Sequence, residues 1–161
     1  DHRYVYSDIG YNLKPTDIQS AIGVRQLEKL PDFIEKRKEN FNKLYSAFSQ
    51  FKKYFLLPGW DKRSDVAWFA FPLYVKASAG FTRQEIVKFL ESKNIETRFI
   101  FGGNILNQPG YRNIECRVYG SLKNSNSIMK NGFFIGLYPA IDSAGIDYIV
   151  KIFKDFLGSK I

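Results

Sequence analysis

Cysteine and histidine are almost absent from this chain, which has one of each among 161 residues. The single cysteine, Cys116, cannot form an internal disulfide and provides too few thiolates to hold a structural zinc ion or an iron–sulfur cluster alone. No apolar run approaches the roughly 18 residues that a membrane-spanning helix requires. A P-loop, a nucleophile elbow, a metal-ligand spacing and a dinucleotide glycine fingerprint are missing as well. The chain therefore offers little catalytic machinery of its own, and we expect a cytoplasmic origin with no metal site and no membrane segment.

The composition is that of a globular domain. Hydrophobic residues make up 45% of the chain and aromatic residues 17%, which is too apolar for a disordered segment. A length of 161 residues suits one ordinary domain, so we expect a single domain over 1–161. The chain starts at Asp1 with neither an initiating methionine nor a secretory signal, and we therefore expect it to be part of a longer protein.

The charge balance is basic, with a formal net charge of +8 and a pI near 9.5. Such a balance indicates an anionic partner, either nucleic acid or a phosphorylated small molecule, or else it only keeps the domain soluble. Lys36, Arg37 and Lys38 share a helical segment with Glu35 and Glu39, which favours solvated helical faces over one anion-binding surface.

Helical periodicity dominates the first third of the chain. Thr16 and Gln19 have the spacing of a capping box, which predicts a helix that begins there. Pro31 predicts either two consecutive helices, the second over about 32–50, or one sharply kinked helix. The apolar residues at helical spacing are Ile18, Ile22 and Leu27 before the proline, and Phe41, Leu44, Tyr45 and Phe48, an expected core stripe, after it.

Strands and helices alternate in the rest of the chain. Strands are expected over 68–76, 96–101 and 133–138, and Pro72 indicates a sheet edge or a bulge in the first of them. A second capping box, Thr82 with Glu85, opens a helix that Asn94 is expected to end in a left-handed conformation. Two more helices are expected, over 125–130 and over the C-terminal segment up to Gly158. The expected inward-facing residues are Ile86, Val87, Phe89, Leu90, Ile146, Ile149, Val150, Phe153 and Leu157.

This order of elements predicts an α+β fold. Long helices at 16–50 should pack on a small sheet layer formed by 51–161, after a lead-in at 1–15. The strand order within the sheet stays open.

Polar residues stand among apolar ones at two places. The first is 10–14, just before a helix N-terminus, where free amides and the helix dipole suit a phosphate, and where Asn12 and Lys14 add a donor and a charge. From spacing alone, an ordinary capped helix with a surface lysine explains this segment better than a phosphate site does. The second place runs from Arg98 through a glycine-rich turn to Gln108.

The segment 10–30 resembles the signature of the DegT family of sugar aminotransferases and dehydratases. The matching residues are Gly10, Asn12, Lys14, Thr16, Ala21, Gly23, Gln26 and Leu27. The resemblance implies an enzyme of the fold-type I class, like aspartate aminotransferase, in which a large domain binds pyridoxal phosphate. It implies that this chain is the smaller C-terminal domain of such an enzyme. We then expect an exposed apolar patch on the helices at 16–50, where the large domain or a partner subunit would cover them.

A closer likeness within the family is to the 3-dehydratases of lipopolysaccharide O-antigen biosynthesis. The residues that carry this likeness are 1–7, 9–12, Thr97, Arg98, Phe101, Gly103, Asn104, Gln108 and Pro109. It implies removal of the 3-hydroxyl from a CDP-linked 4-keto-6-deoxyhexose, with pyridoxamine or pyridoxal phosphate as the electron sink. In this subgroup a histidine upstream of the chain replaces the family's cofactor-binding lysine, and His2 is not that base. No catalytic residue is therefore expected in this chain.

The same resemblance implies binding roles for five residues. Asn12 would reach the cofactor phosphate of the neighbouring subunit in a homodimer with shared sites, and Lys14 stands where many relatives carry arginine. Arg98 would meet the diphosphate of the nucleotide sugar, while Asn104 and Gln108 would bind sugar hydroxyls. A capping role for the first asparagine, an ion pair for the arginine and local turn contacts for the two amides stay open. A reductase partner is implied as well, and the presence of an iron–sulfur cluster stays open.

Two other functions remain to be distinguished. An aminotransferase acting on the same keto sugar shares the cofactor and differs mainly in the upstream base. A basic nucleic-acid-binding module would suit the charge and the aromatics, but the chain has no RNP sequence, GXXG loop or zinc-finger spacing.

Overall fold

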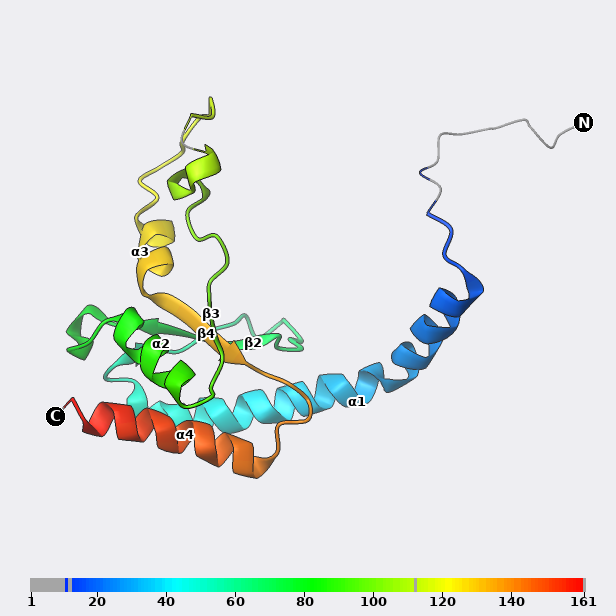
Figure 1. The fold of residues 1–161 in the computed structure, drawn as a ribbon, viewed down its shortest axis with the longest axis horizontal. Helices are drawn as coiled ribbons and strands as arrows, with labels where there is room; N and C mark the ends of the chain where they lie inside the picture. Colours follow the sequence, from blue (N-terminus) through cyan, green and yellow to red (C-terminus); the bar gives the residue numbers. More distant parts are fainter. Residues whose placement is uncertain (1–10, 12, 112, 161) are drawn as a thin grey trace, which may run out of the picture. The chain divides into compact units, whose positions relative to one another are not determined.

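A computed structural model describes residues 11, 13–111 and 113–160 of the chain (Figure 1). The backbone forms two compact units, residues 1–33 and 34–161. The longest helix, α1 (Asp17–Phe48), has residues in both units. Among the described residues, no helix is long and apolar enough to cross a membrane.

Helix α1 begins where the capping-box pattern predicts. The amide of Thr16 donates to Oε1 of Gln19 at 2.9 Å, and the amide of Gln19 donates to Oγ1 of Thr16 at 3.3 Å. Pro31 lies inside this helix, so of the two alternatives the two consecutive helices are wrong and one continuous helix is found. Proline removes one intrahelical hydrogen bond, but it does not prevent the turns on either side from forming.

The N-terminal unit exposes its apolar side chains. Ile18 is 76% exposed and Leu27 is 66% exposed, although both recur at helical spacing. The exposed apolar residues of this unit are Tyr11, Leu13, Ile18, Ile22, Val24, Leu27, Leu30 and Phe33. The exposure of apolar side chains expected on this part of α1 is therefore found, while a contiguous apolar patch stays a prediction.

The larger unit is built on a four-stranded antiparallel sheet. Its strands are β1 (Phe55–Leu56), β2 (Ala70–Val75), β3 (Thr97–Phe99) and β4 (Gly132–Gly136), in the order β1-β2-β4-β3. The α+β class is as predicted, and the three predicted strands correspond to β2, β3 and β4.

Pro72 does not lie in an edge strand, because β2 has β1 on one side and β4 on the other. However, β1 pairs only with Tyr74 and Val75. At Pro72, β2 is therefore paired with β4 alone, opposite Phe134. The missing N–H is tolerated because this end of the strand is locally an edge.

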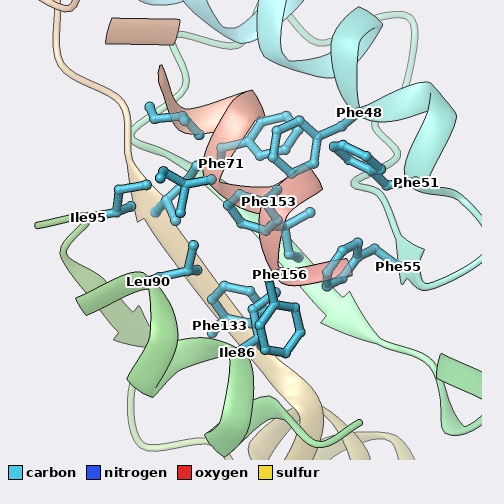
Figure 2. Close-up of a cluster of buried hydrophobic side chains, with 14 of the residues drawn as sticks. Phe48, Phe51, Phe55, Phe71, Ile86, Leu90, Ile95, Phe133, Phe153 and Phe156 are labelled. Carbon is cyan, nitrogen blue, oxygen red and sulfur yellow. The ribbon is translucent and has the colours of Figure 1, made fainter. Parts of the chain in front are cut away.

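Helices cover one face of the sheet in the larger unit (Figure 1). They are the part of α1 after residue 33, α2 (Arg83–Ser92) and α4 (Ser143–Gly158). Figure 2 shows the core that they enclose. The ring centroid of Phe48 lies 5.0 Å from that of Phe71 and 4.7 Å from that of Phe153. The predicted stripe residues Phe41, Leu44 and Phe48 are all fully buried, which confirms that part of the stripe as core.

The predicted helix boundaries in this unit are largely confirmed. Thr82 and Glu85 form the complete capping box of α2, and Asn94 adopts a positive φ of 58° after the helix. Asp142 caps α4 by accepting from the amide of Gly145 at 2.8 Å. The short helix expected over 125–130 is α3, and it spans Lys123–Asn131.

The other face of the sheet is only partly covered. Side chains alternate along a strand, so Phe71, Leu73 and Val75 point into the core while Pro72 and Tyr74 point away from it. Helix α3 reaches this outer face at one end, where the hydroxyl of Tyr74 lies 2.6 Å from Oγ of Ser127.

Candidate functional site

The first predicted site lies before α1. Asn12 and His2 are outside the described residues, and Lys14 is exposed two residues before the capping Thr16. The amides of Thr16 and Gln19 are used by the capping box, and Asp17 places a carboxylate in the first turn. Of the predicted residues, the structure therefore presents one exposed cation, Lys14, beside a helix N-terminus.

The second predicted site begins at Arg98 on β3. Its Nε and Nη2 both donate to Oε1 of Glu96, at 3.0 and 2.6 Å. Both side chains are open to solvent, with 69% of Arg98 and 75% of Glu96 exposed. The guanidinium is therefore held by one solvated ion pair, which contributes little to stability.

Asn104 and Gln108 hold the following turn together. Asn104 is buried and caps the 3-10 helix Ile105–Asn107, with its Oδ1 accepting from the amide of Leu106 at 3.1 Å. Nε2 of Gln108 donates to the carbonyl of Gly102 at 2.8 Å. Both amides thus stabilise the loop, whatever they contact in a complex.

A hollow of about 350 Å³ lies against this loop. Asn104 lines it together with Arg117 and Tyr119, and Cys116 is also part of its wall. Arg98 is not among the lining residues of this hollow, so the structure does not bring Arg98, Asn104 and Gln108 to one cavity. No periodicity or motif in the sequence selects Arg117.

An aromatic cluster on the outer face of the sheet was missed by sequence reasoning. Phe134 of β4 lies between Phe69 and Phe101, with ring centroids 5.9 and 6.1 Å away. In the β3–β4 ladder Arg98 stands directly opposite Phe134. Opposite residues in antiparallel strands share a face, so Arg98 and this cluster lie on the same surface. We call Phe69, Phe101 and Phe134 the outer aromatic cluster.

Arg83 positions α3 relative to α2. Its Nη1 donates to the carbonyls of Met129 and Gly132, at 2.7 and 3.2 Å, and its guanidinium carbon lies 4.0 Å from the centre of the Phe99 ring. Burial lowers the pKa of Arg83 from its ordinary value. These contacts give Arg83 a structural role at the end of α3.

The strongest carboxylate pKa shifts lie away from the predicted site residues. The ammonium of Lys160 and the backbone and hydroxyl of Thr82 lower the pKa of Glu85 to about 2. Hydrogen bonds from the side chain and backbone of Arg63 lower the pKa of Asp61 to about 2. Both shifts come from local ion pairs on the surface and do not indicate an acid–base catalyst.

The fold defines the class of protein. The chain superimposes on E. coli GDP-4-keto-6-deoxy-D-mannose-3-dehydratase with bound hydrated PLP, with a TM-score of 0.80 and 30% identity. The match covers 92% of this chain and 38% of that one. The architecture is thus the one found in the C-terminal part of enzymes with the PLP-dependent aminotransferase fold, as predicted.

The sequence comparison identifies the family. Residues 1–154 match the DegT/DnrJ/EryC1/StrS aminotransferase family, and the chain belongs to it. Lipopolysaccharide biosynthesis protein RfbH of Salmonella typhimurium is 43% identical over 158 residues, covering 98% of this chain and 36% of RfbH. The dTDP-4-dehydro-2,6-dideoxy-D-glucose 3-dehydratase of Saccharopolyspora spinosa is 41% identical, covering 98% of this chain and 34% of that protein. The chain spans about a third of the length of these relatives.

Proposed function

We propose that this chain is the C-terminal domain of a dehydratase that depends on pyridoxamine or pyridoxal phosphate. Its reaction would remove the 3-hydroxyl from a CDP-linked 4-keto-6-deoxyhexose in lipopolysaccharide biosynthesis. The observation that carries the proposal is the 43% identity to RfbH over 98% of the chain. Two further supports are the 41% identity to a sugar 3-dehydratase and the superposition on another.

The chain would contribute binding groups and no catalytic residue. The bound cofactor would supply the electron sink for loss of the hydroxyl. Lys14, which lies in the described part of the chain, would bind this cofactor at its phosphate and at no other group, because it offers an exposed cation beside a helix N-terminus. Asn12 is proposed as the second phosphate ligand, reaching the site of a neighbouring subunit.

The substrate would be bound from the second predicted site. Arg98 is proposed to contact the diphosphate, because its guanidinium is exposed and held only by Glu96. Asn104 and Gln108 are proposed to contact sugar hydroxyls through the second N–H of each side-chain amide, since the first donates to Asn126 and to the carbonyl of Gly102, respectively.

Two protein partners belong to the proposal. A homodimer is supported by the exposed apolar residues of α1, since a surface of this kind marks a protein contact. A reductase is proposed as the second partner, because net replacement of the 3-hydroxyl by hydrogen consumes two electrons and two protons and releases water, and this chain is expected to hold no redox group of its own. Such a biosynthetic enzyme would work in the cytoplasm.

The second candidate is an aminotransferase on the same keto sugar, which the family description favours. Product analysis separates the two. The complete enzyme, loaded with pyridoxamine phosphate and supplied with a reductant, should convert CDP-4-keto-6-deoxy-D-glucose to a product that has lost the C3 oxygen. A 4-amino sugar in place of that product would establish the aminotransferase, and an unchanged substrate with no cofactor absorbance would refute both. The isolated chain serves as the inactive control.

A further inference from the structure

We propose that the outer aromatic cluster is the surface on which the base of the nucleotide-linked sugar stacks, with Arg98 beside it for the diphosphate. This inference rests on the proposed function and deepens it, because it assigns the base to Phe69 and Phe101. The ligand class is a nucleoside diphosphate carried by a sugar.

The cluster exposes two rings around a buried third. Phe69 is 67% exposed and Phe101 is 81% exposed, whereas Phe134 between them is 8% exposed. The ring of Phe134 makes an interplanar angle of 65° with that of Phe69 and 47° with that of Phe101. Phe134 thus forms a floor that supports two rings whose faces remain available to a ligand.

The backbone at Phe69 is held in place by hydrogen bonds from Arg37. Nη1 of Arg37 donates to the carbonyls of Trp68, Phe69 and Leu137, at 3.0, 3.2 and 2.9 Å. The neighbouring Trp68 stacks on Phe41 with ring centroids 3.9 Å apart. Because the backbone that carries the exposed ring is already ordered, little conformational entropy is lost there when a ligand binds. This low entropic cost favours a binding role for Phe69.

The second exposed ring stands on a strained residue. Phe101 has a φ of +44°, in the left-handed region that bulky residues rarely adopt. The left-handed conformation costs free energy in the folded state. The 81% exposure of the apolar ring contributes no burial to offset that cost. Both features are explained if the ring is placed there for a ligand.

A nucleotide matches the chemistry of this surface. Bases stack on aromatic rings whatever their identity, since every base has a π-face, and a guanidinium binds phosphate oxygens with two parallel hydrogen bonds. Arg98 lies opposite Phe134 in the ladder, so both kinds of group share one face. Breaking its solvated pair with Glu96 costs little, so the guanidinium is available for the diphosphate.

A binding experiment with the complete enzyme tests the proposal. The probes are CDP and inorganic pyrophosphate, and dissociation constants are measured by calorimetry for Phe69→Leu, Phe101→Leu, and the matched aromatic controls Phe69→Tyr and Phe101→Tyr. The leucine variants should weaken CDP binding roughly ten- to a hundredfold while pyrophosphate binding stays unchanged. The tyrosine variants should bind CDP as the parent enzyme does. Arg98→Ala should weaken both probes.

Three results would overturn the stacking role. They are an absence of CDP binding in the parent enzyme, leucine variants that bind CDP normally, and leucine variants that lose CDP and pyrophosphate equally. A fall in oligomeric state in sedimentation of the leucine variants would instead identify the cluster as a protein interface, which also contradicts the proposal. Failure of the proposed function is seen separately, in the product analysis and in the cofactor absorbance of the parent enzyme, which keeps all of these side chains.

Discussion

Asn104 and Asn126 are joined by a side-chain hydrogen bond, in which Nδ2 of Asn104 donates to Oδ1 of Asn126 at 2.7 Å. Nδ2 of Asn107 donates to the same oxygen at 2.8 Å. Because Asn126 belongs to α3, these two bonds attach the turn after β3 to that helix. The loop that carries two of the proposed substrate ligands is therefore held by a small polar network.

This network predicts that Asn104→Ala destabilises the domain. The variant loses the bond to Asn126 and the cap on Leu106, which should lower the free energy of unfolding by about 1–3 kcal/mol. Asn104→Asp is the control, since it keeps the capping oxygen and loses the amide donor. Denaturant unfolding of both variants measures the effect. Unchanged stability with reduced nucleotide-sugar affinity would show that Asn104 acts on the ligand alone.

Gly103 should not tolerate a side chain. An added Cβ would lie 2.5 Å from both Cβ and Cγ of Met129, and the residue has a φ of +61°. Gly103→Ala is therefore expected to lower the melting temperature, while Gly136→Ala, whose Cβ meets nothing within 4 Å, changes it little. Equal melting temperatures for the two variants would mean that the turn is packed differently.

Phe48 and Phe69 should differ sharply in their effect on stability. Phe48 is fully buried among aromatic rings, so Phe48→Ala is expected to cost about 3–5 kcal/mol of unfolding free energy. Phe69 is 67% exposed, and Phe69→Ala should stay within about 0.5 kcal/mol of the parent. Chemical denaturation of the two variants tests this contrast. A large loss for Phe69→Ala would show that its ring belongs to the core.

Glu85 should give the domain a pH-dependent stability. Its pKa falls from the ordinary 4.5 to about 2 in the folded chain, chiefly through the bond from Lys160. A carboxyl with a lowered folded pKa stabilises the fold above its unfolded pKa, and this contribution is lost as the pH falls from about 4.5 towards 2. The melting temperature of Glu85→Gln should therefore lie below that of the parent at pH 7, with the gap closing by about pH 2. Lys160→Met is the matched control, and a gap that persists in acid would contradict the assignment.

Short sequence patterns correctly predicted the parts of the fold that depend on interactions between residues close together in the sequence. The capping box at Thr82 and the left-handed Asn94 were correct because a cap depends on residues within one turn. The strand order was not predictable, since β1 is a two-residue strand whose pairing with Tyr74 and Val75 has no periodicity of its own. Pro72 was expected at a sheet edge or a bulge because proline has no N–H to donate, and the structure places it where β2 is an edge only locally.

The candidate site was harder to predict than the fold. Arg98 and Phe101 were selected through the family likeness, but their neighbour Phe134 comes from a strand about 35 residues further on, and the pairing is defined only by the β3–β4 register. Phe69 was assigned to a strand by its apolar neighbours, with no signal that its ring would be exposed. Asn104 and Gln108 were chosen as polar residues in a turn, and the structure shows both bonded within that turn.

Above all, we propose that this chain supplies a cofactor-phosphate ligand at Asn12 and a nucleotide-sugar ligand at Arg98. The direct measurement is the dissociation constant of each ligand for Asn12→Ala and Arg98→Ala in the complete enzyme. A lost hydrogen bond to a charged group costs about 1.5–3 kcal/mol, so each variant should weaken its own ligand roughly ten- to a hundredfold and leave the other nearly unchanged. Equal effects on both ligands, or loss of folding without either, would contradict the claim.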